Sequence, residues 1–67
     1  MQSFKTGDRV TSTFDGLYKG LPGTIISRSL IQQGEHARYI IELDVGKRIV
    51  LWDRNIEYYS YPQDINN

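Results

Sequence analysis

The chain has 67 residues, of which 39% are hydrophobic, and it contains no cysteine. A single domain of this size buries only about 60% of the surface that its unfolded chain exposes, so there is room for one core and no second domain. Without cysteine, disulfides and Cys-based zinc sites are excluded, and stability must come from packing or self-association. Eight Lys and Arg balance eight Asp and Glu, so no net field gathers phosphate or anionic lipid.

The sequence offers no signal for export or for a membrane. Residues 1–6 contain no apolar stretch of signal-peptide length, and no long apolar run occurs elsewhere. These features predict a cytoplasmic protein that makes no membrane contact. We expect one domain over residues 1–67, with an ordered core at about residues 5–60 and a tail at 61–67, because Pro62 cannot continue a central strand.

Short blocks of β-branched and aromatic residues alternate with glycine-bearing turns, which predicts an all-β protein. A first strand is expected at residues 9–13 and a second from Thr24 towards Ile31, with a long loop at residues 14–22 between them. Glycine adopts a positive φ without steric cost, so it suits tight turns. The glycines expected at turns are Gly7, Gly16, Gly20, Gly23 and Gly46.

A polar segment at residues 32–36 predicts a hairpin into a third strand, and the next turn defines a register. If Gly46 is the left-handed bulge residue of a type I turn, Leu43 lies opposite Lys47 and every later pair follows. Glu42 then faces Arg48 as an opposite-charge pair, and Arg38 faces Trp52 in a cation–π contact.

This register divides the third and fourth strands into two faces. One face is apolar and collects Tyr39, Ile41, Leu43, Ile49 and Leu51; the other collects Arg38, Ile40, Glu42, Arg48, Val50 and Trp52. An exposed tryptophan beside two aliphatic side chains would be a contact surface for a partner or for self-association. The alternative is that Trp52 is covered and belongs to the core. After it, residues 53–55 predict a single tight turn and residues 56–59 a last strand.

The first third of the chain resembles the KOW motif of some ribosomal proteins and NusG-type transcription factors. The residues that carry this resemblance are Gly7-Asp8-x-Val10, Gly16, Lys19-Gly20 and Gly23-Thr24-Ile25. Residues 39–51, with the closing strand at Ile56, are similar to the second half of the same barrels, including Tudor-type modules. The resemblance implies a five-stranded antiparallel SH3-like barrel with a single helical turn before the last strand. RNA-binding KOW loops are richer in Lys and Arg, whereas this loop offers Lys19 alone.

The residues favour a binding function over catalysis. His36 is the only histidine, no cysteine completes a metal cluster, and the glycine-rich loop lacks the Gly-Lys-Ser/Thr of a phosphate-binding loop. We therefore predict no catalytic residue, metal or cofactor. One enzyme, the plasmid-borne type II dihydrofolate reductase, is built on a small SH3-like barrel. Its active-site strand has a Val-Gln-Ile-Tyr pattern, whereas Ile49-Val50-Leu51-Trp52 has no glutamine.

A protein-interaction module is the main functional hypothesis. We expect Phe14 and Tyr18 to meet Trp52 and one C-terminal tyrosine, Tyr58, Tyr59 or Tyr61, in a groove for proline-rich or cationic peptide segments. The predicted partner-binding residues are Phe14, Tyr18, Lys19, Arg38, Ile40, Arg48, Val50, Trp52, Tyr58 and Tyr59.

Two other functions stay open from the sequence. The first is nucleic-acid binding by basic residues interleaved with stacking aromatics, namely Arg9, Lys19, Arg28, Arg38, Arg48 and Arg54. The second is a role as a small accessory subunit of a larger complex. The sequence is also compatible with a homo-oligomer that forms through Ile40, Val50 and Trp52.

Overall fold

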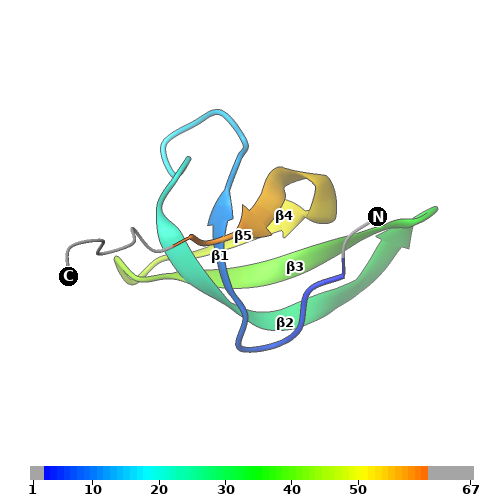
Figure 1. Cartoon of the computed structure of the whole chain (residues 1–67). Helices are drawn as coiled ribbons and strands as arrows, with labels where there is room; N and C mark the ends of the chain where they lie inside the picture. The colour runs from blue at the N-terminus through cyan, green and yellow to red at the C-terminus, as the bar shows by residue number, and fades with distance from the viewer. Residues whose placement is uncertain (1–2, 61–67) are drawn as a thin grey trace.

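The computed structural model describes residues 3–60, except for the side chains of residues 30–33. Five strands form one antiparallel sheet in the order β4-β3-β2-β1-β5 (Figure 1). They are β1 (Arg9–Ser12), β2 (Pro22–Gln33), β3 (His36–Leu43), β4 (Arg48–Trp52) and β5 (Ile56–Tyr58), with a single 3-10 turn, η1 (Asp53–Asn55), before β5.

The all-β prediction is confirmed, and so is the helical turn before the last strand. The closed barrel is not shown, because β4 and β5 are the two edges of the sheet and no pairing joins them among residues 3–60. The tail predicted at residues 61–67 lies outside the described residues. No helix in the described part of the chain is long and apolar enough to cross a bilayer.

The register of the β3–β4 hairpin is the one predicted from the turn sequence. The Leu43 N–H donates to the Lys47 carbonyl over 2.7 Å, and the Gly46 N–H donates to the Leu43 carbonyl over 2.8 Å. Gly46 has a φ of 95°, as the bulge position requires. The pairs that follow are Glu42 with Arg48, Ile41 with Ile49, Ile40 with Val50, Tyr39 with Leu51 and Arg38 with Trp52.

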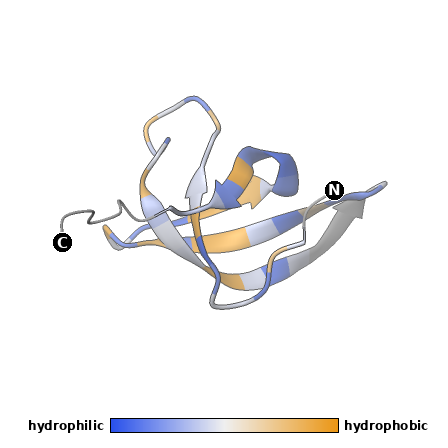
Figure 2. Cartoon of the chain, viewed as in Figure 1, coloured by the Kyte–Doolittle hydropathy of each residue, from blue (hydrophilic) through white to orange (hydrophobic). Residues whose placement is uncertain are grey.

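The core lies on the inner face of the curled sheet, where apolar segments of β1, β2 and β3 come together (Figure 2). Phe4, which precedes the first strand, also belongs to it. Its ring meets Tyr39 edge-to-face at 5.5 Å between centroids, and its N–H donates to the Tyr39 hydroxyl over 3.2 Å. The fully buried side chains are Val10, Ile25, Tyr39, Ile41 and Leu43.

A bidentate ion pair joins β1 to the β3–β4 turn. Arg9 donates from Nη1 to Asp44 Oδ1 over 2.8 Å and from Nη2 to Oδ2 over 2.6 Å. The Arg9 hydrogen bonds hold the pKa of the Asp44 carboxyl below its usual value. Arg9 also donates to Thr24 Oγ1 over 2.8 Å, so one side chain connects β1, β2 and the turn.

Gly23 is a correction to the predicted turn glycines. It lies inside β2, where it pairs with Val10 and Leu43, and it is not among the glycines with positive φ. A Cβ on Gly23 would lie 2.8 Å from Ile41 Cγ2 and 2.9 Å from the Glu42 carbonyl oxygen. Glycine is therefore required here because β3 approaches closely. The other four predicted turn glycines do have positive φ: Gly7, Gly16, Gly20 and Gly46.

The close approach at Gly23 predicts the effect of adding one methyl group. We expect Gly23→Ala to lower the free energy of unfolding by about 1–3 kcal/mol, because the new Cβ meets backbone that must shift. Urea unfolding measures the loss, and the exposed substitution Thr6→Ala is the control, expected to change stability by less than about 0.5 kcal/mol. A Gly23→Ala protein as stable as the wild type would show that the two strands separate at no cost.

Candidate binding groove

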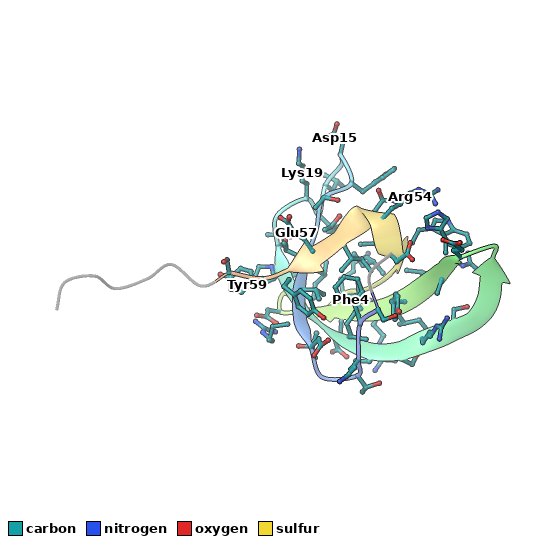
Figure 3. The ribbon with its side chains drawn as sticks, turned by 45° about the vertical axis from the view of Figure 1, so that its right-hand side comes forward. Phe4, Asp15, Lys19, Arg54, Glu57 and Tyr59 are labelled. Carbon is teal, nitrogen blue, oxygen red and sulfur yellow. The ribbon has the colours of Figure 1, made fainter. Side chains whose placement is uncertain are left out.

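The long loop between β1 and β2 forms an arch over β4. At its base the Gly20 N–H donates to the Ser12 carbonyl over 2.9 Å, and the Phe14 N–H donates to Ser12 Oγ over 3.1 Å. At its tip, Lys19 Nζ lies 3.0 Å from Asp15 Oδ1 (Figure 3). The charge of Lys19, a predicted partner-binding residue, is therefore offset within the arch itself.

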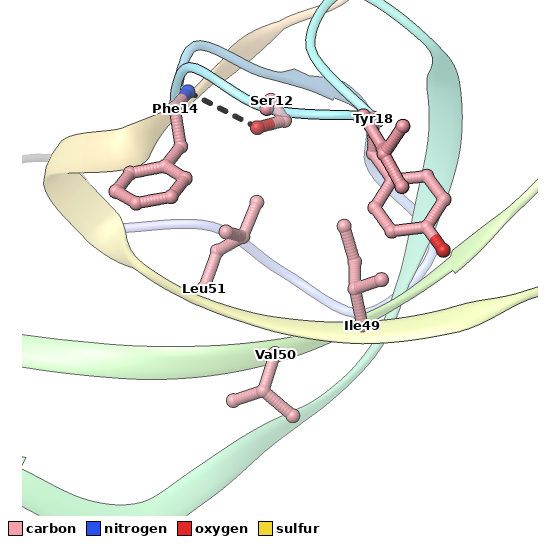
Figure 4. A pocket seen from close by; sticks show the side chains of 8 residues that line it. Ser12, Phe14, Tyr18, Ile49, Val50 and Leu51 are labelled. Carbon is pink, nitrogen blue, oxygen red and sulfur yellow. Dashed lines mark hydrogen bonds between the residues drawn. The ribbon is translucent and has the colours of Figure 1, made fainter.

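An apolar groove runs between this arch and β4. Its larger cavity, about 300 Å³, is lined by Ser12, Phe14, Gly16, Leu17, Tyr18, Ile49, Val50 and Leu51. In Figure 4, Phe14 and Tyr18 reach down from the arch while Ile49 and Leu51 reach up from β4. The Val50 side chain points to the opposite side of β4, which leaves the main chain at Val50 to border the space between its neighbours.

A second cavity continues the groove towards the end of β4. It has a volume of about 180 Å³ and shares Phe14, Val50 and Leu51 with the first. Its remaining lining residues are Arg38, Trp52 and Asn55. Phe14 and Trp52 thus line one cavity and Phe14 and Tyr18 line the adjoining one, so these three aromatic residues lie along a single groove.

Two arginines contact Trp52 where the groove ends. The Arg38 guanidinium carbon lies 5.3 Å from the ring centroid, and that of Arg54 lies 5.6 Å from it. Neither arginine forms an ion pair within residues 3–60, and the buried Nε of Arg38 has no hydrogen-bond acceptor there. Trp52 is half-buried, so it is neither a fully exposed contact nor a core residue.

Two predicted partner-binding tyrosines lie away from this groove, which corrects the expected aromatic cluster. Tyr58 packs against Phe4 with 5.0 Å between ring centroids, and the Tyr59 ring lies 6.0 Å from the Arg9 guanidinium carbon. Figure 3 shows Tyr59 and Arg54 at opposite ends of the η1–β5 segment. The β5 strand pairs with β1, and this pairing carries both tyrosines away from Trp52. Tyr61 lies outside the described residues.

The outer face of β3 and β4 carries the remaining predicted residues, Ile40 and Arg48. Ile40 is half-buried and pairs with Val50, and Arg48 Nε lies 3.3 Å from Glu42 Oε1. The predicted Glu42–Arg48 ion pair and the Arg38–Trp52 contact are therefore both present. The positive charge of Arg48 adds little to the groove, because the neighbouring Glu42 carboxylate offsets it.

Asp53 fixes the helical turn that follows Trp52. It is a buried carboxylate, with Oδ1 2.9 Å from His36 Nδ1 and Oδ2 3.5 Å from the Ala37 N–H. Burial raises the pKa of the Asp53 carboxyl, but the hydrogen bonds from His36 and Ala37 outweigh it and the pKa lies below its usual value. This contact links η1 to the start of β3 and thereby positions Trp52 and Arg54.

Four residues that line the groove were not among the predicted site residues: Leu17, Ile49, Leu51 and Asn55. Ile49 and Leu51 were assigned to the core face, and both pack against the core as well as lining the groove. Leu17 had a usable signal, because a leucine at the tip of a glycine-rich loop has no sheet to bury it.

Comparison of the chain with protein-family models, curated proteins and solved structures found no match. No three His, Asp or Glu side chains gather as a metal site within residues 3–60. The groove is the strongest candidate site, because it combines apolar walls, an edge strand and two arginines that have no carboxylate partner among residues 3–60.

The buried carboxylate makes stability depend on pH. An unfolded aspartate has a pKa of about 3.9, and the lower folded value means that Asp53 adds stability above this pH and loses it as the pH falls through the folded pKa. We expect Asp53→Asn to cost about 1–3 kcal/mol at neutral pH, because the amide accepts fewer hydrogen bonds, and to weaken the loss of stability on acidification.

Urea unfolding near pH 7 and pH 3 measures both effects. Asp15→Asn, which removes an exposed carboxylate of the arch, is the control and should keep the pH dependence of the wild type. Identical pH dependence in the wild type and Asp53→Asn would mean that Asp53 does not contribute to the acid sensitivity.

Proposed function

We propose that this protein is a small non-enzymatic protein-interaction module whose groove between the arch and β4 holds apolar side chains of a partner. The continuous apolar lining of that groove carries the proposal. Phe14 is 58% exposed and Leu17 is 87% exposed, although both are large hydrophobic residues that line the groove. Exposed apolar surface around a polar-rimmed groove is characteristic of binding sites in small proteins.

The fold type and the cellular location are part of the same proposal. We propose that the curled five-stranded sheet is an SH3-like barrel with a KOW-like arch, and that the protein works in the cytoplasm without a cofactor. The strand order, the 3-10 turn before β5 and the positive-φ glycines of the arch support the fold assignment. A fold of this kind serves many functions, so the function rests on the groove alone.

The charge distribution disfavours two ligands considered from the sequence, a cationic peptide and a nucleic acid. A cationic peptide would meet Arg38 and Arg54 already placed at the Trp52 ring, and like charges repel at this distance. A nucleic acid would find several basic residues engaged with carboxylates, since Arg9, Lys19 and Arg48 each form an ion pair. These pairs break the basic track that phosphate binding requires.

A matched pair of exposed residues tests the groove. Leu17 is 87% exposed and lines the groove, whereas Val45 is 68% exposed and lies in the β3–β4 turn. We expect Leu17→Asp to abolish affinity capture of partner proteins from a lysate of the source cells, because a carboxylate placed in an apolar groove loses hydration. Capture should be unchanged in Val45→Asp.

Quantitative mass spectrometry of the captured proteins gives the readout, and circular dichroism checks that both variants are folded. Equal capture by the two variants would refute the groove as the binding site. Capture of nucleic acid with a steep loss of affinity as salt rises would replace the proposal with the nucleic-acid alternative.

A further inference from the structure

We infer that the free edge of β4 accepts an extended, acidic segment of a partner protein as an additional antiparallel or parallel strand. This inference rests on the proposed function and specifies its ligand. Three observations point to it: the unpaired backbone of β4, the cavities beside that strand and the two arginines at its end.

The hairpin register determines which backbone groups of β4 are free. In an antiparallel ladder, hydrogen-bonded pairs alternate with pairs whose N–H and C=O groups point outward. Leu43 is hydrogen-bonded to Lys47, so Ile49 and Leu51 also bond to β3. The N–H and C=O groups of Arg48, Val50 and Trp52 therefore point away from β3, on the side where no strand of residues 3–60 neighbours β4.

The same edge lacks the features that normally prevent strand addition. Edge strands are commonly protected by proline, by bulges, by inward-pointing charges or by being very short. The five residues of β4 contain no proline, the β3–β4 pairing is regular, and its only charged residue, Arg48, is at the start. At the other edge of the sheet, β5 has only three residues.

The cavities beside β4 match the side chains of an added strand. The two cavities adjoin, because Phe14, Val50 and Leu51 line both of them. Alternate residues of an extended segment point to the same side. A strand alongside β4 would thus place one set of alternate side chains beside Ile49 and Leu51, at the larger cavity, and the intervening set on the side of Arg38 and Trp52.

The charge at the end of the groove selects an acidic segment. Arg38 and Arg54 flank Trp52 without an ion-pair partner in residues 3–60, whereas Arg9 and Arg48 are each neutralised by a carboxylate. In the described part of the chain, the buried Nε of Arg38 also has no hydrogen-bond acceptor. A carboxylate on the partner would accept charge-assisted hydrogen bonds from these guanidiniums. These bonds would offset the free-energy cost of burying the guanidiniums in the complex.

A phage-displayed library of random twelve-residue peptides is the first probe. We expect selection on the immobilised protein to enrich segments that alternate apolar residues and carry Asp or Glu at one end. Enrichment of Lys-rich or Arg-rich segments, of proline-rich segments without alternation, or of no segment at all would overturn the inference.

The selected peptide with the highest affinity then tests the role of the positive charges of Arg38 and Arg54. We expect Arg38→Gln combined with Arg54→Gln to weaken its binding by about tenfold in fluorescence anisotropy, as two lost ion pairs imply. Lys47→Gln removes a positive charge from the distant β3–β4 turn and should change the affinity by less than about twofold. Equal effects of the double variant and of Lys47→Gln would contradict the role of the two arginines.

N-methylation of the same peptide tests strand addition without altering the protein. Methylating an amide that faces β4 removes a ladder donor, so methylation at alternate positions should abolish binding while methylation at the intervening positions should leave it intact. Absence of this alternation would overturn the strand geometry. If Leu17→Asp still blocked partner capture in that case, the proposed function would stand and only this inference would fail.

Sedimentation tests whether β4 binds a second copy of the chain instead of a segment of another protein. Equilibrium sedimentation over a concentration series should give a monomer for the free protein, because β4 of a second copy carries no carboxylate that could pair with Arg38 and Arg54. A dimer that the selected peptide dissociates would show that β4 pairs with itself, and it would contradict the assignment of a foreign acidic segment.

Discussion

The register of the β3–β4 hairpin determines which side chains enter the core and which backbone groups of β4 face outward. Because Gly46 takes the left-handed position of a bulged turn, Leu43 and Lys47 pair and the alternation of faces follows for the whole hairpin. A shift of one residue would turn Tyr39 and Ile41 to the outside and remove the centre of the core. The Arg9–Asp44 ion pair fixes the same turn to β1, so the register and the sheet are stabilised together.

The candidate site is a product of this register. It places Trp52 opposite Arg38 and directs the outward backbone groups of β4 to an edge that no strand covers. The arch contributes Phe14, Leu17 and Tyr18 to the other wall. Asp53 then holds the turn after Trp52 through its contacts with His36 and Ala37, which positions Arg54 against the tryptophan. A binding groove thus arises from backbone pairing and packing, with few specialised residues.

Local rules were sufficient to predict the hairpin, whereas the helical turn before β5 was expected from the resemblance to small barrels. Turn chemistry at Asp44-Val45-Gly46 and the two-residue period of β3 and β4 both act over short distances, and they agree with each other. Gly23 was misassigned because its constraint is tertiary: β3 passes too close for a Cβ, and no neighbouring residue in the chain signals this. Phe4 likewise joins the core through contacts with residues far away in the sequence.

The groove could be predicted only in part for the same reason. Phe14, Tyr18 and Trp52 were expected to converge, and they line one continuous groove. The nearness of Tyr58 and Tyr59 to Trp52 in the sequence was misleading, because η1 redirects the chain and β5 pairs with β1. The free edge of β4 follows from the strand order, which no local pattern in this sequence determines.

Amide hydrogen exchange by NMR measures the open edge of β4 directly, residue by residue. If β4 pairs with β3 alone in the stated register, the amides of Ile49 and Leu51 are protected and those of Arg48, Val50 and Trp52 exchange rapidly. Binding of an added strand would then protect Val50. Slow exchange at Val50 in the free monomer, or protection that alternates in the opposite phase, would contradict both the register and the open edge.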